Sequence, residues 1–526
     1  MRDFHLPGRS TVMADNGMVA TSTPLAAKVA VDMLQSGGNA VDAAIAGAVL
    51  LGLCEPQMTG IGGDLFALVK KPGSEDVIAL NGSGRAPAGL SAALLKEQGF
   101  ETMPEHHAHA VTLPGAVDAF CRLSADYGAK GIDAALAPSI KYMREGVPIA
   151  PRTAFDWSKS DGVFNAAAKR DYLINGKPAK AGDRFALPRQ AEVLEAIAKD
   201  GAKAFYEGEI AEDMVSTLQA AGGVHTLEDF ASVSSDYTDP ISGSYKSHSL
   251  IEHAPNGHGA TAILMNNILA EFDLPDMDPI GSQRAHIEAE AAKLAYDARN
   301  RFLADMDYMT RLDHMLDPKT GSALAALINP TRAMADPTEM SGSVHKETIY
   351  ITVVDKDRMM VSLIYSIFHT FGSAIATDKF GILMHNRGAG FTLEDGHPNQ
   401  VAGGKRPMHT IIPAMLADDK GVRMSFGVMG GAYQPNGHAR VVTNMIDYGM
   451  HPQQALDAPR SFFDKGQLKV ERGYSDKVRT ELTGLGHEVI IPETAIGGAQ
   501  AIWLDPSNGV LHGASDARKD GCAIGY

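Results

Sequence analysis

Two apolar strands joined by a short turn begin at residue 348, and this hairpin limits the folds open to the chain. Residues 348–354 read Thr-Ile-Tyr-Ile-Thr-Val-Val and residues 359–365 read Met-Met-Val-Ser-Leu-Ile-Tyr, both rich in residues that favour strands. The polar residues 355–358 between them are typical of a turn. Strands this apolar are buried on at least one face, so the hairpin needs further layers to cover it.

The rest of the chain supplies those layers. Helical spacing or helix-end signals occur mainly before the hairpin, at 25–35, 39–53, 190–199 and 283–303. Strand patterns occur at 65–69 and, after the hairpin, at 381–384, 411–416 and 423–428. We therefore predict an α+β fold in which helices cover stacked sheets.

Composition and the chain ends narrow the classes of function. The 47 Lys and Arg residues against 63 Asp and Glu give a net charge of −16, which argues against a nucleic-acid partner. The longest apolar stretch, Ala43–Cys54, is too short to span a bilayer, which takes about 20 residues, and no secretory signal is evident. We expect a cytoplasmic protein without a membrane partner. Its three scattered cysteines argue against a disulfide framework or a thiolate zinc site.

Local motifs for several common chemistries are missing. The glycine-rich segment 60–64 precedes a strand and lacks both nucleotide-binding patterns, so tight turns explain it better. Residues 105–109 hold three histidines without metal-ligand spacing, and we expect them to form a polar surface loop. No G-x-S-x-G sequence marks a serine hydrolase.

A series of ordered motifs points instead to one family. They are the segments 35–44, 60–64, 110–116, 144–148, 348–355, 371–373, 405–407, 430–431, 513–518 and 525–526. Together they resemble the gamma-glutamyltransferase family of N-terminal nucleophile hydrolases over nearly the whole chain. The resemblance implies a four-layered αββα sandwich in which two processed pieces share one core.

The resemblance also implies a reaction. The precursor cuts itself between Glu347 and Thr348, giving a helix-rich large subunit, 1–347, and a strand-rich small subunit, 348–526. The freed amine of Thr348, with a pKa of about 7.7–8.0, then activates its own hydroxyl for attack on an amide. The amides of Gly430 and Gly431 would stabilise the oxyanion. The pieces remain together as a heterodimer, a larger oligomer stays open, and no cofactor or metal is needed.

Two further hydroxyls belong to this expected centre. Ser366 lies where the family has a hydroxyl that hydrogen-bonds the nucleophile. Thr352 is four residues along the strand from Thr348, so both side chains should share a face. Taken without the resemblance, Thr348 would be interpreted as an ordinary strand threonine, as most threonines in such runs are.

The residues expected to bind substrate depart from the gamma-glutamyl pattern. Gly390 falls where family members have a carboxylate for the substrate ammonium, so such a charge would be buried unpaired. Arg387 is gained and favours a substrate carboxylate, with a structural salt bridge as the alternative. The other expected binding residues are Phe368, His369, Asn386, His409, Thr410 and, displaced by about two positions, Arg85.

With these departures, the residue pattern resembles that of the oxamate amidohydrolase branch of the family. We therefore expect an N-terminal threonine amidohydrolase acting on a small carboxylate-bearing amide. Two alternatives stay open: a gamma-glutamyl hydrolase or transpeptidase acting on glutathione-like substrates, and a homologue that is not processed and serves as a scaffold.

Overall fold

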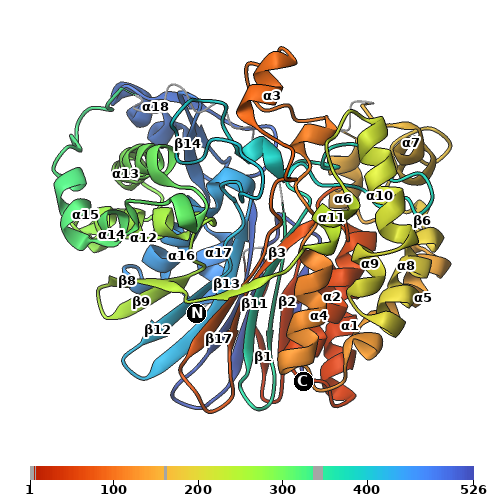
Figure 1. Cartoon of the computed structure of the whole chain (residues 1–526). Coiled ribbons are helices and arrows are strands. Elements are labelled where there is room, and N and C mark those ends of the chain that lie inside the picture. The colour runs from red at the N-terminus through yellow and green to blue at the C-terminus, as the bar shows by residue number, and fades with distance from the viewer. Residues whose placement is uncertain (1–4, 6–7, 159–162, 336–347) are drawn as a thin grey trace.

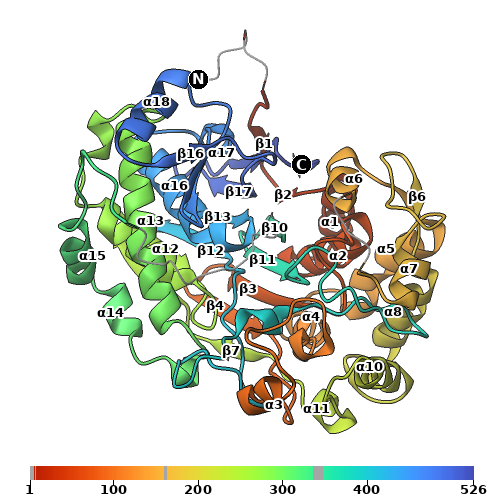
Figure 2. The same ribbon diagram turned by 90° about the horizontal axis from the view of Figure 1, so that it is seen from above.

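Two stacked sheets with a helical layer on each outer side make up the molecule (Figures 1 and 2). The computed structural model describes residue 5 and residues 8–158, 163–335 and 348–526. Each main sheet has seven strands. The predicted αββα sandwich is confirmed.

The first sheet mixes strands from both sides of residue 348. Its strands, all paired antiparallel, are in order β19 (Cys522–Gly525), β2 (Met18–Thr21), β10 (Ile349–Val354), β11 (Met360–Ser366), β3 (Asp64–Lys70), β4 (Val77–Gly82) and β7 (Asp236–Thr238). The predicted hairpin is β10 and β11, and it lies at the centre of this sheet.

The second sheet also combines strands from before and after residue 348. Its order is β1 (Val12–Ala14), β18 (Leu511–Ser515), β17 (Gly498–Leu504), β13 (Gly421–Met429), β12 (Ala414–Asp418), β9 (His248–Glu252) and β8 (Ile241–Tyr245). Two small sheets are made by β14 (Ser461–Asp464), β15 (Gln467–Val470) and β16 (Glu488–Ile490), and by β5 (Val147–Pro148) and β6 (Arg184–Phe185).

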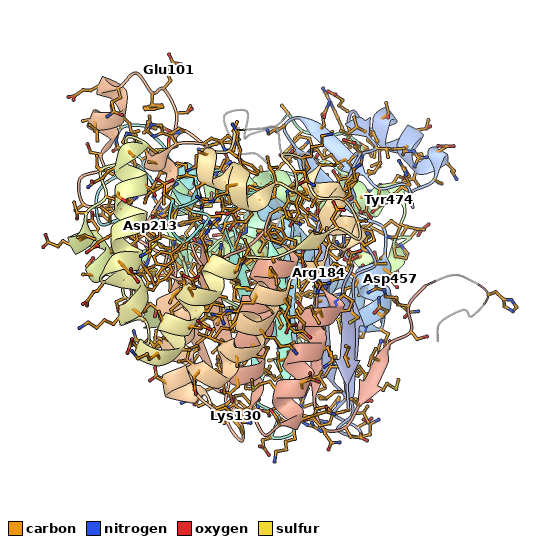
Figure 3. All side chains as sticks on the ribbon, turned by 90° about the vertical axis from the view of Figure 1, so that its right-hand side faces the viewer. Glu101, Lys130, Arg184, Asp213, Asp457 and Tyr474 are labelled. Carbon is orange, nitrogen blue, oxygen red and sulfur yellow. The ribbon has the colours of Figure 1, made fainter. Side chains whose placement is uncertain are left out.

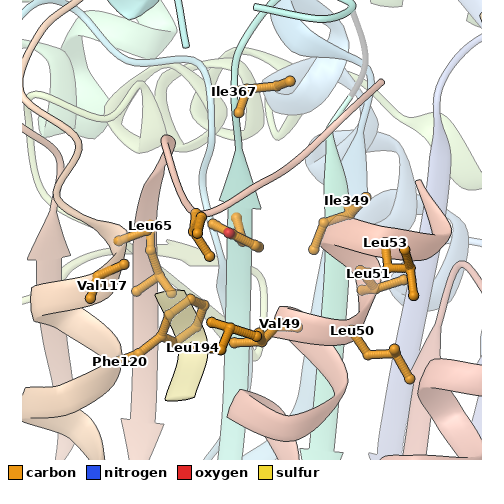
Figure 4. Close-up of a cluster of buried hydrophobic side chains, with 14 of the residues drawn as sticks. Val49, Leu50, Leu51, Leu53, Leu65, Val117, Phe120, Leu194, Ile349 and Ile367 are labelled. Carbon is orange, nitrogen blue, oxygen red and sulfur yellow. The ribbon is translucent and has the colours of Figure 1, made fainter. Parts of the chain in front are cut away.

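One helical layer covers the first sheet. The helices next to it are α1 (Pro24–Gln35), α2 (Ala40–Cys54) and α4 (Ala116–Tyr127), backed by α5 (Ile132–Glu145) and α8 (Pro188–Asp200). Around them lie α6 (Pro151–Trp157), α7 (Ala166–Tyr172), α9 (Lys203–Tyr206), α10 (Glu209–Ala220) and α11 (Leu227–Ala231), whereas α3 (Ala92–Glu97) lies apart, at the top of Figure 1. Every residue of α2 is buried, and its Asn39 cap forms a capping box with Asp42. Figure 4 shows apolar side chains of α2 packed against β10.

A second helical layer covers the other sheet. It contains α12 (Gly259–Leu269), α13 (Ser282–Phe302), α14 (Leu312–Leu316), α15 (Pro318–Ala325), α16 (Gln434–Ile446), α17 (Pro452–Asp457) and α18 (Asp476–Gly484).

Charged residues such as Glu101 and Lys130 are exposed and lie at opposite ends of the molecule (Figure 3). Among the described helices, none combines the length and apolar character needed to cross a bilayer.

The space between the sheets contains ordered polar contacts as well as apolar ones. The Thr352 hydroxyl on β10 donates a hydrogen bond to Ser425 on β13 at 2.7 Å. The hydroxyls of Tyr350 and Ser362 are also 2.7 Å apart. Both contacts satisfy buried hydroxyls, and the bond from Thr352 to Ser425 joins the hairpin to the opposite sheet.

Two expectations from the sequence are corrected. Residues 381–384 do not form a strand and make only isolated bridges, Ala376 with Leu383 and Gly62 with Met384. The segment instead winds through turns, one of them at Gly381 with a φ of 66°. The histidine cluster is not a polar surface loop throughout, because His109 is buried in a short 3-10 helix and contacts Gln98 at 2.7 Å.

Candidate active site

Three polar side chains form a row across neighbouring strands of the first sheet. Ser366 at the end of β11 is paired with Asp64 at the start of β3, and one step beyond the Ile349–Tyr365 pair places Thr348 opposite Ser366. Directly paired residues share a face of the sheet. The hydroxyl oxygens of Thr348 and Ser366 are 3.4 Å apart. The structure therefore brings together the two hydroxyls that the sequence analysis paired.

The chain beyond β11 is strained in a way that fixes Ser366. Phe368 has a φ of 73°, and its amide donates to the Ser366 hydroxyl at 2.9 Å. On the other side, a Cβ on Gly63 would lie 2.3 Å from the Ser366 carbonyl oxygen. Only glycine allows the two chains to approach this closely.

Gly430 and Gly431 follow β13 on the facing sheet. Thr352 on β10 contacts Ser425 on β13. Two residues along each strand, Tyr350 faces Gly427, where an added Cβ would lie only 2.4 Å from the Tyr350 ring. Continuing this step by two residues on each strand, we infer that Met429, the residue before Gly430, lies near the level of Thr348. Gly430 and Gly431 have φ values of 128° and 55° and begin the short 3-10 helix Gly431–Tyr433, which continues into α16. Backbone amides at such a helix start suit the stabilisation of an oxyanion.

Beside this row lies a buried charge network around Asp64. The Arg387 guanidinium donates to both carboxylate oxygens, from Nε at 3.0 Å and from Nη2 at 3.3 Å, and its Nη1 donates to the Thr410 hydroxyl at 3.1 Å. Asp64 also contacts His409 Nε2 at 2.7 Å. The Phe368 ring lies 4.2 Å from the guanidinium. The structural salt bridge that the sequence left open for Arg387 is therefore present.

The network carries one negative and one positive charge. Burial alone raises the pKa of the Asp64 carboxyl, but Arg387, His409 and His385 together hold it below its usual range. Burial, followed by the charge of Arg387, lowers the pKa of His409 to about 3, so this ring is neutral at pH 7. Its Nδ1 accepts the amide of Ile411 at 3.3 Å, which places the ring proton on Nε2 for Asp64.

His369 and Asn386 form a second polar group. The Asn386 side chain accepts the His369 amide at 3.0 Å and lies 3.0 Å from its Nδ1. The carboxylate of Glu105 is 3.3 Å from the same Nδ1.

The position where the family has a carboxylate is closed by the backbone. An added Cβ on Gly390 would lie 2.6 Å from the Met408 carbonyl oxygen, so no carboxylate side chain fits there.

Other predicted residues lie apart from these contacts. Thr352 shares the predicted face, but its hydroxyl is bonded to Ser425, so its catalytic role stays a prediction. Arg85 is 40% exposed and contacts Asp236, Asp305 and the Gly404 carbonyl. It lines a cavity of about 210 Å³ that also contains Arg406. Glu347, the other half of the predicted cleavage site, lies outside the described residues.

The residues that sequence reasoning missed are Asp64 and Glu105. Both lie in segments that it had singled out for other reasons, the glycine-rich segment 60–64 and the histidine cluster 105–109. A carboxylate directly after two glycines, Gly62 and Gly63, at the start of a buried strand was the available signal for Asp64.

One group of described residues has the composition of a metal site. Ligand atoms of His286, Glu290 and His487 lie within 4.8 Å of one another, and all three residues are buried. However, Lys293 donates to Glu290 at 2.8 Å and supplies the positive charge that a cation would bring. The two histidine rings contact each other at 2.8 Å. The group thus forms an internal ion-pair network.

Comparison with known proteins gives consistent results. The gamma-glutamyltranspeptidase family profile matches residues 26–526. The glutathione hydrolase-like YwrD proenzyme of Bacillus subtilis is 33% identical over 528 residues, covering 98% of this chain and 99% of that protein. The oxamate amidohydrolase proenzyme of Klebsiella pneumoniae is 32% identical, with coverage of 98% and 100%. A cephalosporin acylase structure from Bacillus halodurans has a TM-score of 0.92 and 35% identity, covering 100% of this chain and 99% of that one.

Proposed function

Since this chain belongs to the gamma-glutamyltranspeptidase family and is an enzyme of the N-terminal nucleophile amidohydrolase class, we propose that Thr348 is its nucleophile. One observation carries the proposal. Thr348 is the residue directly before β10, and its hydroxyl oxygen lies 3.4 Å from the hydroxyl oxygen of Ser366. A threonine at the start of a central strand, near the level of the residue before Gly430, has the geometry for attack beside an oxyanion site.

The reaction follows from the groups present. Cleavage before Thr348 frees an amine that takes the proton of the Thr348 hydroxyl, and the oxygen attacks the substrate carbonyl. The tetrahedral oxyanion is bound by backbone amides, the protonated amine returns its proton to the leaving nitrogen, and an ester remains on Thr348. Water then hydrolyses that ester to a free acid and restores the hydroxyl.

Two pieces cut at this point would stay together. β2 and β3 come from the chain before the cut, β10 and β11 from the chain after it, and they are hydrogen-bonded neighbours at the centre of one sheet. Separating the pieces would expose both faces of buried strands, so we propose a heterodimer of 347 and 179 residues. The word proenzyme in the names of the Bacillus subtilis and Klebsiella pneumoniae relatives supports this reading.

For the substrate we propose a small amide that carries a carboxylate, as oxamate does. Arg387, held by Asp64, is a cation that would favour a substrate carboxylate. The missing acceptor at Gly390 argues against the ammonium of a gamma-glutamyl group. The name of the Klebsiella pneumoniae relative agrees with this choice, whereas that of the Bacillus subtilis relative favours glutathione.

The test is the covalent intermediate itself. Matured protein is mixed with oxamate or with gamma-glutamyl p-nitroanilide, quenched in acid within seconds, and the small piece is weighed by mass spectrometry. We expect an acyl adduct on the peptide that begins with Thr348, with oxamate and not with the anilide. An adduct from the anilide alone would favour the gamma-glutamyl alternative, and no adduct on Thr348 with any turned-over amide would overturn the nucleophile.

A further inference from the structure

We propose that Asp64 is a positioning residue that sets the specificity of this enzyme by holding Arg387 ready for a substrate carboxylate. The inference rests on the proposed function and adds to it a residue of the first strand layer that the sequence did not suggest. Among the described residues, the Asp64 side chain hydrogen-bonds Arg387 and His409 rather than Thr348 or Ser366, so its effect on substrate passes through those two side chains.

The arrangement of the N–H donors of Arg387 supports this role. A guanidinium has five N–H donors, and Asp64 takes the Nε–H and one Nη2–H, while Thr410 takes one Nη1–H. One N–H is left on each terminal nitrogen without a partner among the described residues. Two such donors can hold a carboxylate as a fork, provided that the guanidinium cannot rotate.

Three contacts prevent that rotation. The carboxylate of Asp64 fixes one edge of the guanidinium, the Thr410 hydroxyl fixes Nη1, and the Phe368 ring covers one face at 4.2 Å. Phe368 is itself held by the bond from its amide to Ser366. The orientation of Arg387 is therefore tied to the same residue that contacts the nucleophile.

The spacing indicates a short acyl group. Asp64 and Ser366 are paired, and Thr348 lies on the next strand, so Thr348 and Asp64 are two strand spacings apart, about 9–10 Å. The Arg387 guanidinium is bonded to Asp64, at one end of this interval. A carboxylate one or two carbons from the reacting carbonyl suits such a gap, whereas a long acyl chain does not.

The experiment compares one charged and one neutral substrate with the same reacting amide. Steady-state kinetics with oxamate and with oxamide, its uncharged analogue, are measured on matured wild type and Asp64→Asn. We expect kcat/KM for oxamate to fall about 10- to 100-fold, mainly through KM, because the carboxylate loses an oriented fork. For oxamide we expect a change of less than about threefold.

Other roles for Asp64 predict different results. If it only compensated the charge of Arg387, Asp64→Asn would leave a free cation, and oxamate would bind more tightly. If it only supported the fold, both substrates would lose equally. Glu288→Gln is the matched control, because Glu288 is a buried carboxylate on the outer helix α13 that pairs with Arg284 of the same helix and with Arg440 of α16. It should leave the ratio of the two substrates unchanged. Tighter oxamate binding or equal losses would overturn the inference.

A second variant and a second readout protect the test. Should Asp64→Asn fail to fold, Arg387→Lys keeps the cation beside Asp64 but lacks the fork, and it should lose oxamate selectively in the same way. Stabilisation by oxalate, seen as a rise in melting temperature, needs no turnover. We expect it in the wild type and not in either variant.

These readouts separate the inference from the proposed function. A processed wild type that neither hydrolyses oxamate nor is stabilised by oxalate would refute the role of Asp64 and leave the Thr348 nucleophile standing. An unprocessed chain would refute the nucleophile, and the oxalate shift measured on that same protein would still decide whether Asp64 positions a carboxylate site.

Discussion

Replacing Ser366 by alanine should slow both self-cleavage and turnover while leaving the fold in place. The Ser366 hydroxyl has two neighbours, the Thr348 hydroxyl at 3.4 Å and the Phe368 amide at 2.9 Å. Its loss leaves the buried Phe368 amide unpaired, which costs about 1–3 kcal/mol of stability. It also removes the partner that orients the nucleophile. For a loss of about 1.4–2.7 kcal/mol of transition-state stabilisation we expect rates about 10- to 100-fold lower.

Ser362→Ala is the matched control for this prediction. Ser362 lies on the same face of β11, is equally buried, and contacts the Tyr350 hydroxyl at 2.7 Å and the Ala414 amide at 3.2 Å. Its removal should cost at least as much stability and leave the processing rate within about threefold. Newly synthesised precursors are followed by intact mass over time, beside their melting temperatures. Equal processing rates in Ser366→Ala and wild type, or equal slowing in both variants, would show that Ser366 does not orient the nucleophile.

Three further outcomes follow from the geometry. Gly430→Ala places a side chain at a φ of 128° and should lower kcat about 100- to 1000-fold without preventing folding, and a normal kcat would remove it from the oxyanion site. Gly63→Ala would set a Cβ 2.3 Å from the Ser366 carbonyl oxygen, so the melting temperature and processing should both fall, and an unchanged enzyme would contradict the close approach. Burial lowers the pKa of His225 and of His253 to about 4 in the folded protein, below the unfolded value of about 6.5, so the unfolded chain binds more protons. Stability should therefore be lost as the pH falls from about 6.5 to 4, by about 1–2 kcal/mol for each histidine at pH 5, and urea unfolding that is equally difficult at pH 7 and pH 5 would refute this sign.

The sequence predicted those parts of the fold that depend on local signals. The β-branched run after residue 347 predicted β10, and Asn39 predicted the start of α2, because strand propensity and helix capping act within a few residues. Residues 381–384 were wrongly predicted as a strand for a related reason. Their apolar side chains are buried, but the positive φ at Gly381 turns the chain, and burial alone does not make a strand.

The site was predicted only where one sequence segment carries it. Thr348 and Ser366 lie on one hairpin, so their spacing already places them together. The partners of Asp64 lie more than 300 residues away, at Arg387 and His409, and meet it only because β3 pairs with β11. Such contacts depend on sheet order and on loops, neither of which has a local pattern. For the same reason the alternatives for Arg387 could not be separated from the sequence alone.

The intact mass of the purified protein, measured beside a Thr348→Ala variant, decides whether Thr348 is the nucleophile. We expect two fragments in the wild type, 347 and 179 residues long, and a single chain of 526 residues in the variant. Glu347→Gln should still be cut, because the attacking group belongs to Thr348. A single uncut chain in the wild type, or fragments that persist in Thr348→Ala, would contradict the claim that Thr348 is the nucleophile.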